Sequence, residues 1–144
     1  MNTLKKNNSG FTLLEIIIVV IIVGVLASLA LPRLFRNVEF SRSTEAMAAI
    51  GAIRSSMERC LLKRSSTGDY AACDAFGTEL DIANPVGNPG SHFGYAVNDT
   101  ANGYNIVATR NTLNGGDGVA TITVTLDTVA GTITKAGTNA FSDI

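Results

Sequence analysis

One carboxylate stands inside a long apolar segment near the amino terminus. Between Phe11 and Leu31 the only residues that are not hydrophobic are Thr12, Glu15, Gly24 and Ser28. At about 1.5 Å per helical residue, about 20 residues span the ~30 Å hydrocarbon core of a bilayer. An ionised acid costs about 2 to 3 kcal/mol at the bilayer centre and less near an interface. Glu15 therefore needs either a cationic partner or a polar environment at the edge of the membrane.

The other polar groups form no catalytic or metal-binding pattern. His92 is the only histidine, and no cysteine or carboxylate is spaced around it as a metal ligand, so we predict a loop or strand-edge role. Segment 114–118 has one carboxylate. Calcium prefers six or more oxygen ligands, so we predict a turn there. We treat the sequon at 98–100 as a chance match. No nucleophile has a positioned base, and we predict neither an enzyme nor a bound metal or cofactor.

The composition predicts a membrane helix joined to one polar domain. The chain has 144 residues, 46% of them hydrophobic, and a formal net charge of -1. That length suits a single domain, and a charge near zero gives no electrostatic basis for contact with nucleic acid. The apolar run lies in the first third, whereas the sequence after Ser65 is rich in Gly, Thr, Asn and Asp.

The amino terminus has the features of an export signal. Lys5 and Lys6 precede the apolar run. A basic segment in this place is typical of a signal whose positive end stays in the cytoplasm, so the carboxyl terminus is expected outside. Small residues at 27–30 loosely match an ordinary signal cleavage site. Cleavage there is disfavoured, because the run is longer than a normal signal core and continues into an amphipathic helix.

Ser9 to Glu15 reads Ser-Gly-Phe-Thr-Leu-Leu-Glu. This stretch resembles the prepilin cleavage motif of type IV pilins and of the related pseudopilins of type II secretion. The resemblance implies that a membrane prepilin peptidase/methyltransferase cleaves between Gly10 and Phe11 and N-methylates Phe11. It also implies storage in the inner membrane, then assembly by the pilus machinery into a helical homo-oligomeric filament. That filament would be extracellular for a pilin and periplasmic for a pseudopilin.

Cleavage before Phe11 would place a cationic amine where it offsets the desolvation of Glu15. Within one chain, Phe11 and Glu15 lie four residues apart at the helix start. Between chains, Glu15 would meet the amine of a neighbour and fix the axial register of packed helices. The resemblance favours this intermolecular version. A carboxylate resting among headgroups is the remaining alternative, but it does not account for the adjoining Gly10 and Phe11.

The expected helix contains two weakening residues. Pro32 removes a backbone hydrogen bond and predicts a kink, and Gly24 weakens the same span. The alternative is that Pro32 ends the membrane helix. Beyond it, apolar residues at helical spacing predict an amphipathic continuation over 33–64. The apolar stripe consists of Ala46, Ala49, Ile50, Ile53, Met57, Cys60 and Leu61.

Charged and aromatic residues follow the membrane run. Four charged residues are expected either to pair between subunits or to form a solvated face. They are Arg33, Arg36, Glu39 and Arg42. Two aromatic residues in the same stretch, Phe35 and Phe40, are expected to pack rather than to carry electrons.

Cys60 and Cys73 are the only cysteines. In an oxidising compartment a disulfide is favoured over two buried free thiols. A disulfide closing a loop of this size would stabilise the fold by about 3 kcal/mol. Many members of the resembling family place their bridge near the carboxyl terminus. This chain has no cysteine there, so the receptor-binding region bounded by those cysteines is not carried over.

Alternating apolar runs predict strands at 93–97, 104–108, 120–126 and around Ile133. Turn residues separate the runs, so we expect an antiparallel meander with one wet face packed on the helix stripe. The predicted class is α+β: a long amino-terminal helix on a small antiparallel sheet of about four strands, the pilin fold implied by the resemblance. The expected divisions are a leader 1–10, a membrane half 11–32, an amphipathic half 33–64, a loop 65–92, and a sheet with tail 93–144. Residues 33–144 are expected to form the globular domain.

Three functions remain open from the sequence. The favoured one is a structural pilin that polymerises through its helix into a type IV pilus on the bacterial surface. A pseudopilin of type II secretion is the alternative in the same assembly class. A membrane-anchored periplasmic binding domain or enzyme comes from a different class, but it leaves Gly10, Phe11 and Glu15 without a shared explanation.

Overall fold

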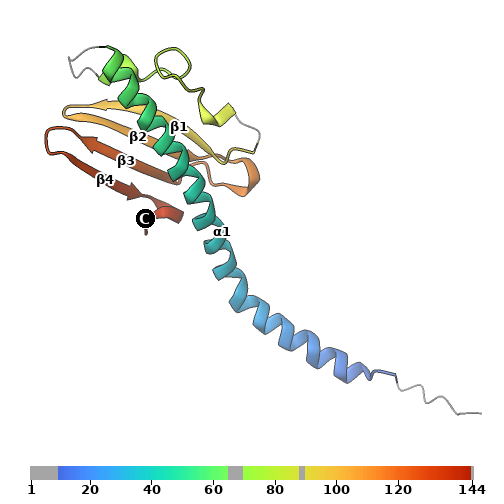
Figure 1. Cartoon of the computed structure of the whole chain (residues 1–144). Helices are drawn as coiled ribbons and strands as arrows, with labels where there is room; N and C mark the ends of the chain where they lie inside the picture. The colour runs from blue at the N-terminus through green and yellow to red at the C-terminus, as the bar shows by residue number, and fades with distance from the viewer. Residues whose placement is uncertain (1–9, 65–69, 88–89, 144) are drawn as a thin grey trace, which may run out of the picture. The chain divides into compact units, whose positions relative to one another are not determined.

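The computed structural model describes residues 10–64, 70–87 and 90–143. One long helix, α1 (Leu13–Lys63), precedes a four-stranded antiparallel sheet (Figure 1). The predicted α+β class is therefore confirmed. The chain divides into two compact units at residues 37 and 38, so that α1 contributes to both.

The sheet is a meander in which each strand pairs with its neighbour in sequence. Its strands are β1 (Phe93–Thr100), β2 (Gly103–Arg110), β3 (Thr121–Asp127) and β4 (Thr132–Gly137), in the spatial order β1-β2-β3-β4. All three pairings are antiparallel. The four predicted strands are confirmed, and the structure extends most of them by one to three residues.

The second half of α1 lies across one face of the sheet and supplies one wall of the core (Figure 1). The predicted apolar stripe is buried, except that Ala49 and Leu61 are only partly buried. The opposing sheet residues are those whose side chains alternate toward the helix. They are Phe93, Tyr95, Val97, Tyr104, Ile106, Ala108, Ile122 and Val124. Burial raises the pKa of Tyr95 and of Tyr104 to about 12, so both phenols stay neutral near pH 7.

The segment between helix and sheet has little regular secondary structure, and a disulfide joins it to the helix. It contains two short 3-10 helices, Tyr70–Cys73 and Pro85–Gly87, and an isolated bridge between Phe76 and Leu80. A disulfide joins Cys60 of α1 to Cys73, with the two Cα atoms 6.1 Å apart. Residues 65–69 and 88–89 of the predicted loop lie outside the described residues.

Replacing both cysteines, as Cys60→Ala with Cys73→Ala, should lower the free energy of unfolding by about 3 kcal/mol, because the closed loop restricts the unfolded chain. The measurement is thermal unfolding of the full chain in detergent, followed by circular dichroism. The matched control is reduction: the parent protein in reductant should unfold near the temperature of the double variant. A variant that unfolds at the parent's temperature would contradict a stabilising role for the bond.

Candidate assembly site

The start of α1 places the residues of the predicted cleavage and assembly motif at an exposed helix terminus. The backbone N–H of Glu15 donates to the hydroxyl of Thr12 at 3.3 Å. Thr12 therefore occupies the N-cap position, and Glu15 is the third residue of the helix. A carboxylate in the first turn also interacts favourably with the helix dipole. Phe11 precedes the cap and is 80% exposed.

Sequence reasoning missed the role of Thr12. The pattern Thr-x-x-Glu directly before an apolar run is the capping-box signature, and it would have identified the helix start. Its consequence is that Glu15 has a local function as well as any intermolecular one. A test of Glu15 must therefore separate its charge from its position in the cap.

The apolar part of α1 has no covering within its own unit. Every residue from 13 to 37 is exposed, and none of the strongly apolar part of this segment is buried. By length and composition this helix can cross a membrane. Such a surface in water would be strongly unfavourable, at about 25 cal/mol per Å² of apolar area.

Gly24 and Pro32 lie inside a continuous helix. The alternative in which Pro32 ends the membrane helix is wrong, because α1 runs on to Lys63. The surroundings of Gly24 are open: a Cβ built there meets nothing within 4 Å. Near Pro32 the hydroxyl of Ser28 donates to the carbonyl of Val25 at 2.7 Å. The kink itself stays a prediction.

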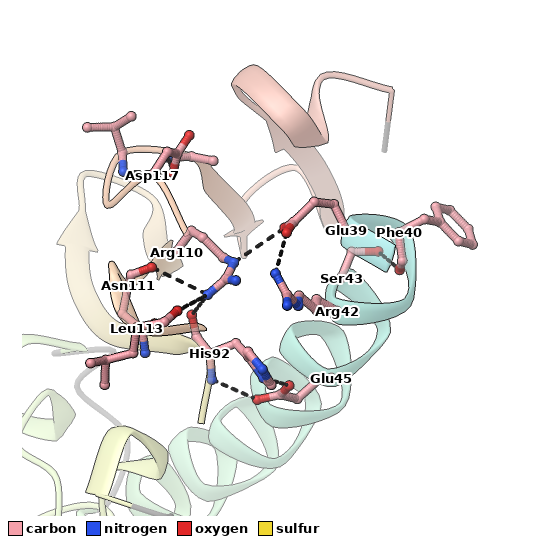
Figure 2. Close-up of polar contacts among 12 residues, drawn as sticks. Glu39, Phe40, Arg42, Ser43, Glu45, His92, Arg110, Asn111, Leu113 and Asp117 are labelled. Carbon is pink, nitrogen blue, oxygen red and sulfur yellow. Dashed lines mark hydrogen bonds and ion pairs between the residues drawn. The ribbon is translucent and has the colours of Figure 1, made fainter. Parts of the chain in front are cut away.

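A buried guanidinium, Arg110, connects the end of β2 to α1 (Figure 2). Arg110 is 1% exposed, and its Nε donates to Glu39 Oε2 at 3.3 Å. One terminal nitrogen donates to the carbonyl of His92 at 2.9 Å and to Asn111 Oδ1 at 3.2 Å. Gly116 packs against this group, since a Cβ there would lie 2.8 Å from the guanidinium carbon. A charge this deeply buried is tolerated only because carboxylate and carbonyl oxygens surround it.

Two of the four charged residues that follow the membrane run, Glu39 and Arg42, have partners within the chain. Glu39 accepts from Arg42 at 2.5 Å as well as from Arg110. Neither side chain of the Glu39–Arg42 pair is more than a quarter exposed. Glu39 and Arg42 therefore do not form the solvated face that was one of the two expected arrangements. Pairing between subunits stays a prediction. Phe35 and Phe40 are 65% and 68% exposed rather than packed, and Phe40 points away from the cluster in Figure 2.

His92 forms a second link between the sheet and the helix. It precedes β1, its Nδ1 lies 2.7 Å from Glu45 Oε2, and its backbone N–H donates to the other oxygen of Glu45 at 3.2 Å. The predicted loop or strand-edge position is confirmed, because His92 lies in the loop directly before β1, and its partner Glu45 is new. In the part of the chain that the structure describes, no three His, Cys, Asp or Glu side chains gather as metal ligands. Asp117 instead stabilises a turn, accepting from the backbone of Val119 and Ala120.

Asp81 makes the third link, near the carboxyl end of α1. Ser56 is fully buried and donates to Asp81 Oδ1 at 2.5 Å, and the backbone N–H of Asp81 donates back to that hydroxyl at 3.1 Å. Arg59 approaches both carboxylate oxygens at 2.7 Å. The hydrogen bonds from Arg59 and then Ser56 hold the pKa of Asp81 well below its usual 3.8. The three links hold the amphipathic half of the helix to the sheet and to the segment that precedes it.

Comparison with known proteins gives matches at the amino terminus and over much of the chain. A family model described as the prokaryotic N-terminal methylation motif matches residues 5–31. A type IV major fimbrial protein FimA of Dichelobacter nodosus is 31% identical over 108 residues, covering 68% of this chain and 69% of that protein. A second FimA of the same organism is 32% identical over 88 residues, or 61% of this chain and 53% of that protein.

A secretion protein is also similar. The type II secretion system core protein G of Pseudomonas aeruginosa is 33% identical over 85 residues, covering 59% of this chain and 57% of that protein. The chain thus spans between 53% and 69% of the length of these three relatives.

Arg110→Met should lower the free energy of unfolding by about 3 kcal/mol, because it leaves Glu39 without its buried partner. The matched control is Arg64→Met, which breaks the more exposed pair with Glu79 and should cost less than about 1 kcal/mol. Both values come from unfolding of the full chain in detergent. Equal losses in the two variants would contradict the importance of burial at Arg110.

The Asp81 links predict a dependence on acid. Because the folded carboxylate binds a proton less readily than the unfolded one, its stabilisation is complete above the unfolded pKa of 3.8 and is lost as the pH falls further. Asp81→Asn should therefore unfold at a lower temperature than the parent at pH 7, and the difference should shrink toward pH 2. Asp74→Asn, at an exposed aspartate of the same segment, is the control. A difference that stays constant with pH would contradict the assignment.

Proposed function

We propose that this chain, which belongs to the type IV pilin family, is a structural subunit that polymerises through α1 into a type IV pilus filament. The observation that carries the proposal is the exposed apolar helix between residues 13 and 37, which adjoins a unit with its own closed core. A helix of this kind is stable in a membrane or against identical helices, and not in water. Filament assembly exchanges the first environment for the second.

Processing of the amino terminus precedes assembly. Cleavage between Gly10 and Phe11 removes the leader 1–10, and methylation of the new Phe11 amine by the prepilin peptidase/methyltransferase follows. The match of residues 5–31 to the N-terminal methylation motif supports processing at this place. Phe11 lies outside the capped helix and is exposed, so the enzyme reaches the bond without unwinding α1.

Glu15 then sets the axial position of each subunit. Its carboxylate lies in the first turn of α1, in a segment whose neighbouring side chains are apolar. Pairing with the Phe11 amine of an adjacent subunit neutralises both charges inside the apolar bundle, and only one axial displacement brings them together. Apolar contact alone would allow neighbouring helices to slide. Gly24 and Pro32 are the places where the packed helix bends to adapt.

The proposed subunit begins in the inner membrane, anchored by residues 11–32, and passes through the pilus assembly machinery into an extracellular filament. Residues 33–144 form the exported part. The FimA proteins it resembles are named type IV major fimbrial proteins, which supports a structural role over a membrane-anchored enzyme or binding domain. The similarity to core protein G supports a type II secretion pseudopilin as the second candidate. Filaments on the cell surface, rather than in the periplasm, distinguish the first candidate from the second.

Glu15→Ala should leave membrane insertion intact and reduce the yield of surface filaments about tenfold or more, since one unpaired buried charge per subunit costs well over 1.4 kcal/mol. Glu15→Gln is the matched variant: it keeps the capping-box residue type but removes the charge. We expect it to fail in assembly as well. Filaments are sheared from cells and quantified against the chain in the membrane fraction.

Mass spectrometry of the same samples provides the control. Both variants should still be cleaved after Gly10, so that a loss of filaments reports assembly rather than processing. Thr12→Ala weakens the cap without changing the charge and should assemble better than either Glu15 variant. Normal filament yield from Glu15→Gln would refute the pairing, and an intact leader on the parent chain would refute the proposed processing.

A further inference from the structure

The face of the sheet turned away from α1 has an unusual composition. Alternate residues of each strand point to this face, and the strand register aligns them in ranks across β1 to β4. We call it the outer face. Its two central ranks are Ala96, Val107, Thr123 and Ala136, and Asn98, Asn105, Thr125 and Thr134. The flanking ranks are Gly94, Thr109, Thr121 and Thr138, and Thr100, Gly103, Asp127 and Thr132.

The outer face is almost free of charge. Eight of its sixteen residues are threonine and one, Asp127, is charged. Asp127 lies in the last rank and accepts hydrogen bonds from the backbone of Val129 and Ala130, at 2.9 and 2.8 Å. The chain as a whole has 23 basic and acidic residues, 11 and 12 respectively, so charge is concentrated elsewhere. All sixteen residues except Gly103 are accessible to solvent.

Neighbouring polar side chains on this face bond to one another. Asn98 donates to the side chain of Asn105 at 2.9 Å, and the hydroxyls of Thr121 and Thr138 lie 2.9 Å apart. Their hydrogen bonds are therefore partly satisfied within the sheet, which lowers the cost of removing water from above them. Depletion of charge is the compositional signal of an interface core.

We propose that the outer face is where filaments of this chain contact one another side by side, so that the partner is a second copy of the chain. Any charged group near the two-fold axis of a symmetric contact faces its own copy, and like charges repel. A face without charge in its central ranks is therefore suited to meet itself. The inference rests on the proposed function, because a filament built on α1 turns the opposite side of the sheet outward.

The size of the face explains why the contact belongs to filaments and not to free subunits. Four strands about 4.8 Å apart and four ranks about 6.8 Å apart give about 500 Å². A face-to-face pair would bury about 1,000 Å² in total, less than the ~1,200 to 2,000 Å² of stable complexes. Two filaments present rows of such faces, and linked weak contacts combine into strong association. Bundling is thus expected only after polymerisation.

The test uses filaments sheared from cells that produce the full chain. Thr123 lies in a central rank, so Thr123→Lys and Thr123→Glu each bring like charges together across the contact. We expect the bundled fraction, measured by low-speed sedimentation and by electron microscopy, to fall at least about tenfold in each variant. An equal mixture of Lys and Glu filaments should bundle again, because unlike charges then meet. Thr78→Lys adds the same charge at an exposed position away from the sheet and should bundle like the parent.

The possible results separate this inference from the proposed function. Single filaments from the variants show that the chain folds and polymerises, and rescue by mixing requires that the face meets itself. Parent filaments that stay single, variants that bundle like the parent, or a mixture that stays dispersed would each overturn the lateral contact while leaving the pilin proposal in place. A parent chain that forms no filaments would count against the proposed function and, with it, against this contact.

Discussion

The chain contains an apolar helix that it cannot bury. Between residues 13 and 37 every position is exposed, and burial of each large aliphatic side chain there is worth about 1.5 to 3 kcal/mol. Among the described residues, the second unit closes its own core between the stripe of α1 and the sheet. A chain of this design is stable where lipid or other helices cover this surface. The proposed storage in a membrane and the proposed filament each meet that requirement.

The amphipathic half of α1 meets the opposite requirement, since it must be held firmly on the sheet. The apolar stripe supplies most of the burial, but apolar contact is weakly directional. Three polar links supply direction: Glu39 to Arg110, Glu45 to His92 and Ser56 to Asp81. These links are spread along α1, and the disulfide between Cys60 and Cys73 adds a covalent link near the end of the helix. A load applied to the helix would therefore be shared between several points in the sheet and in the segment before it.

Patterns local in sequence predicted most of the fold. The helical stripe from Ala46 to Leu61 and the four alternating strands each depend on residues that are near one another in the sequence. The pairing in the disulfide was predictable because the chain has only two cysteines. The polar links were not predictable in this way. Glu39 and Arg110 are 71 residues apart, and their meeting depends on the register of helix over sheet, which no local pattern encodes. The exposure of Phe35 and Phe40 was missed for a related reason: aromatic residues suggest packing, but the sequence does not say whether the partner lies in the same chain.

The order of strands also affects how the exported part acquires its structure. Every strand pairs with the one that precedes it, so each hairpin closes only a short loop. Domains whose contacts are mostly local fold quickly. In the proposed export, the amino terminus enters the membrane first, and β1 to β4 then emerge in the order in which they pair. The sheet can grow one hairpin at a time on a helix already held at the bilayer, which limits the time for which an unpaired strand edge is open to a neighbouring chain in a crowded membrane.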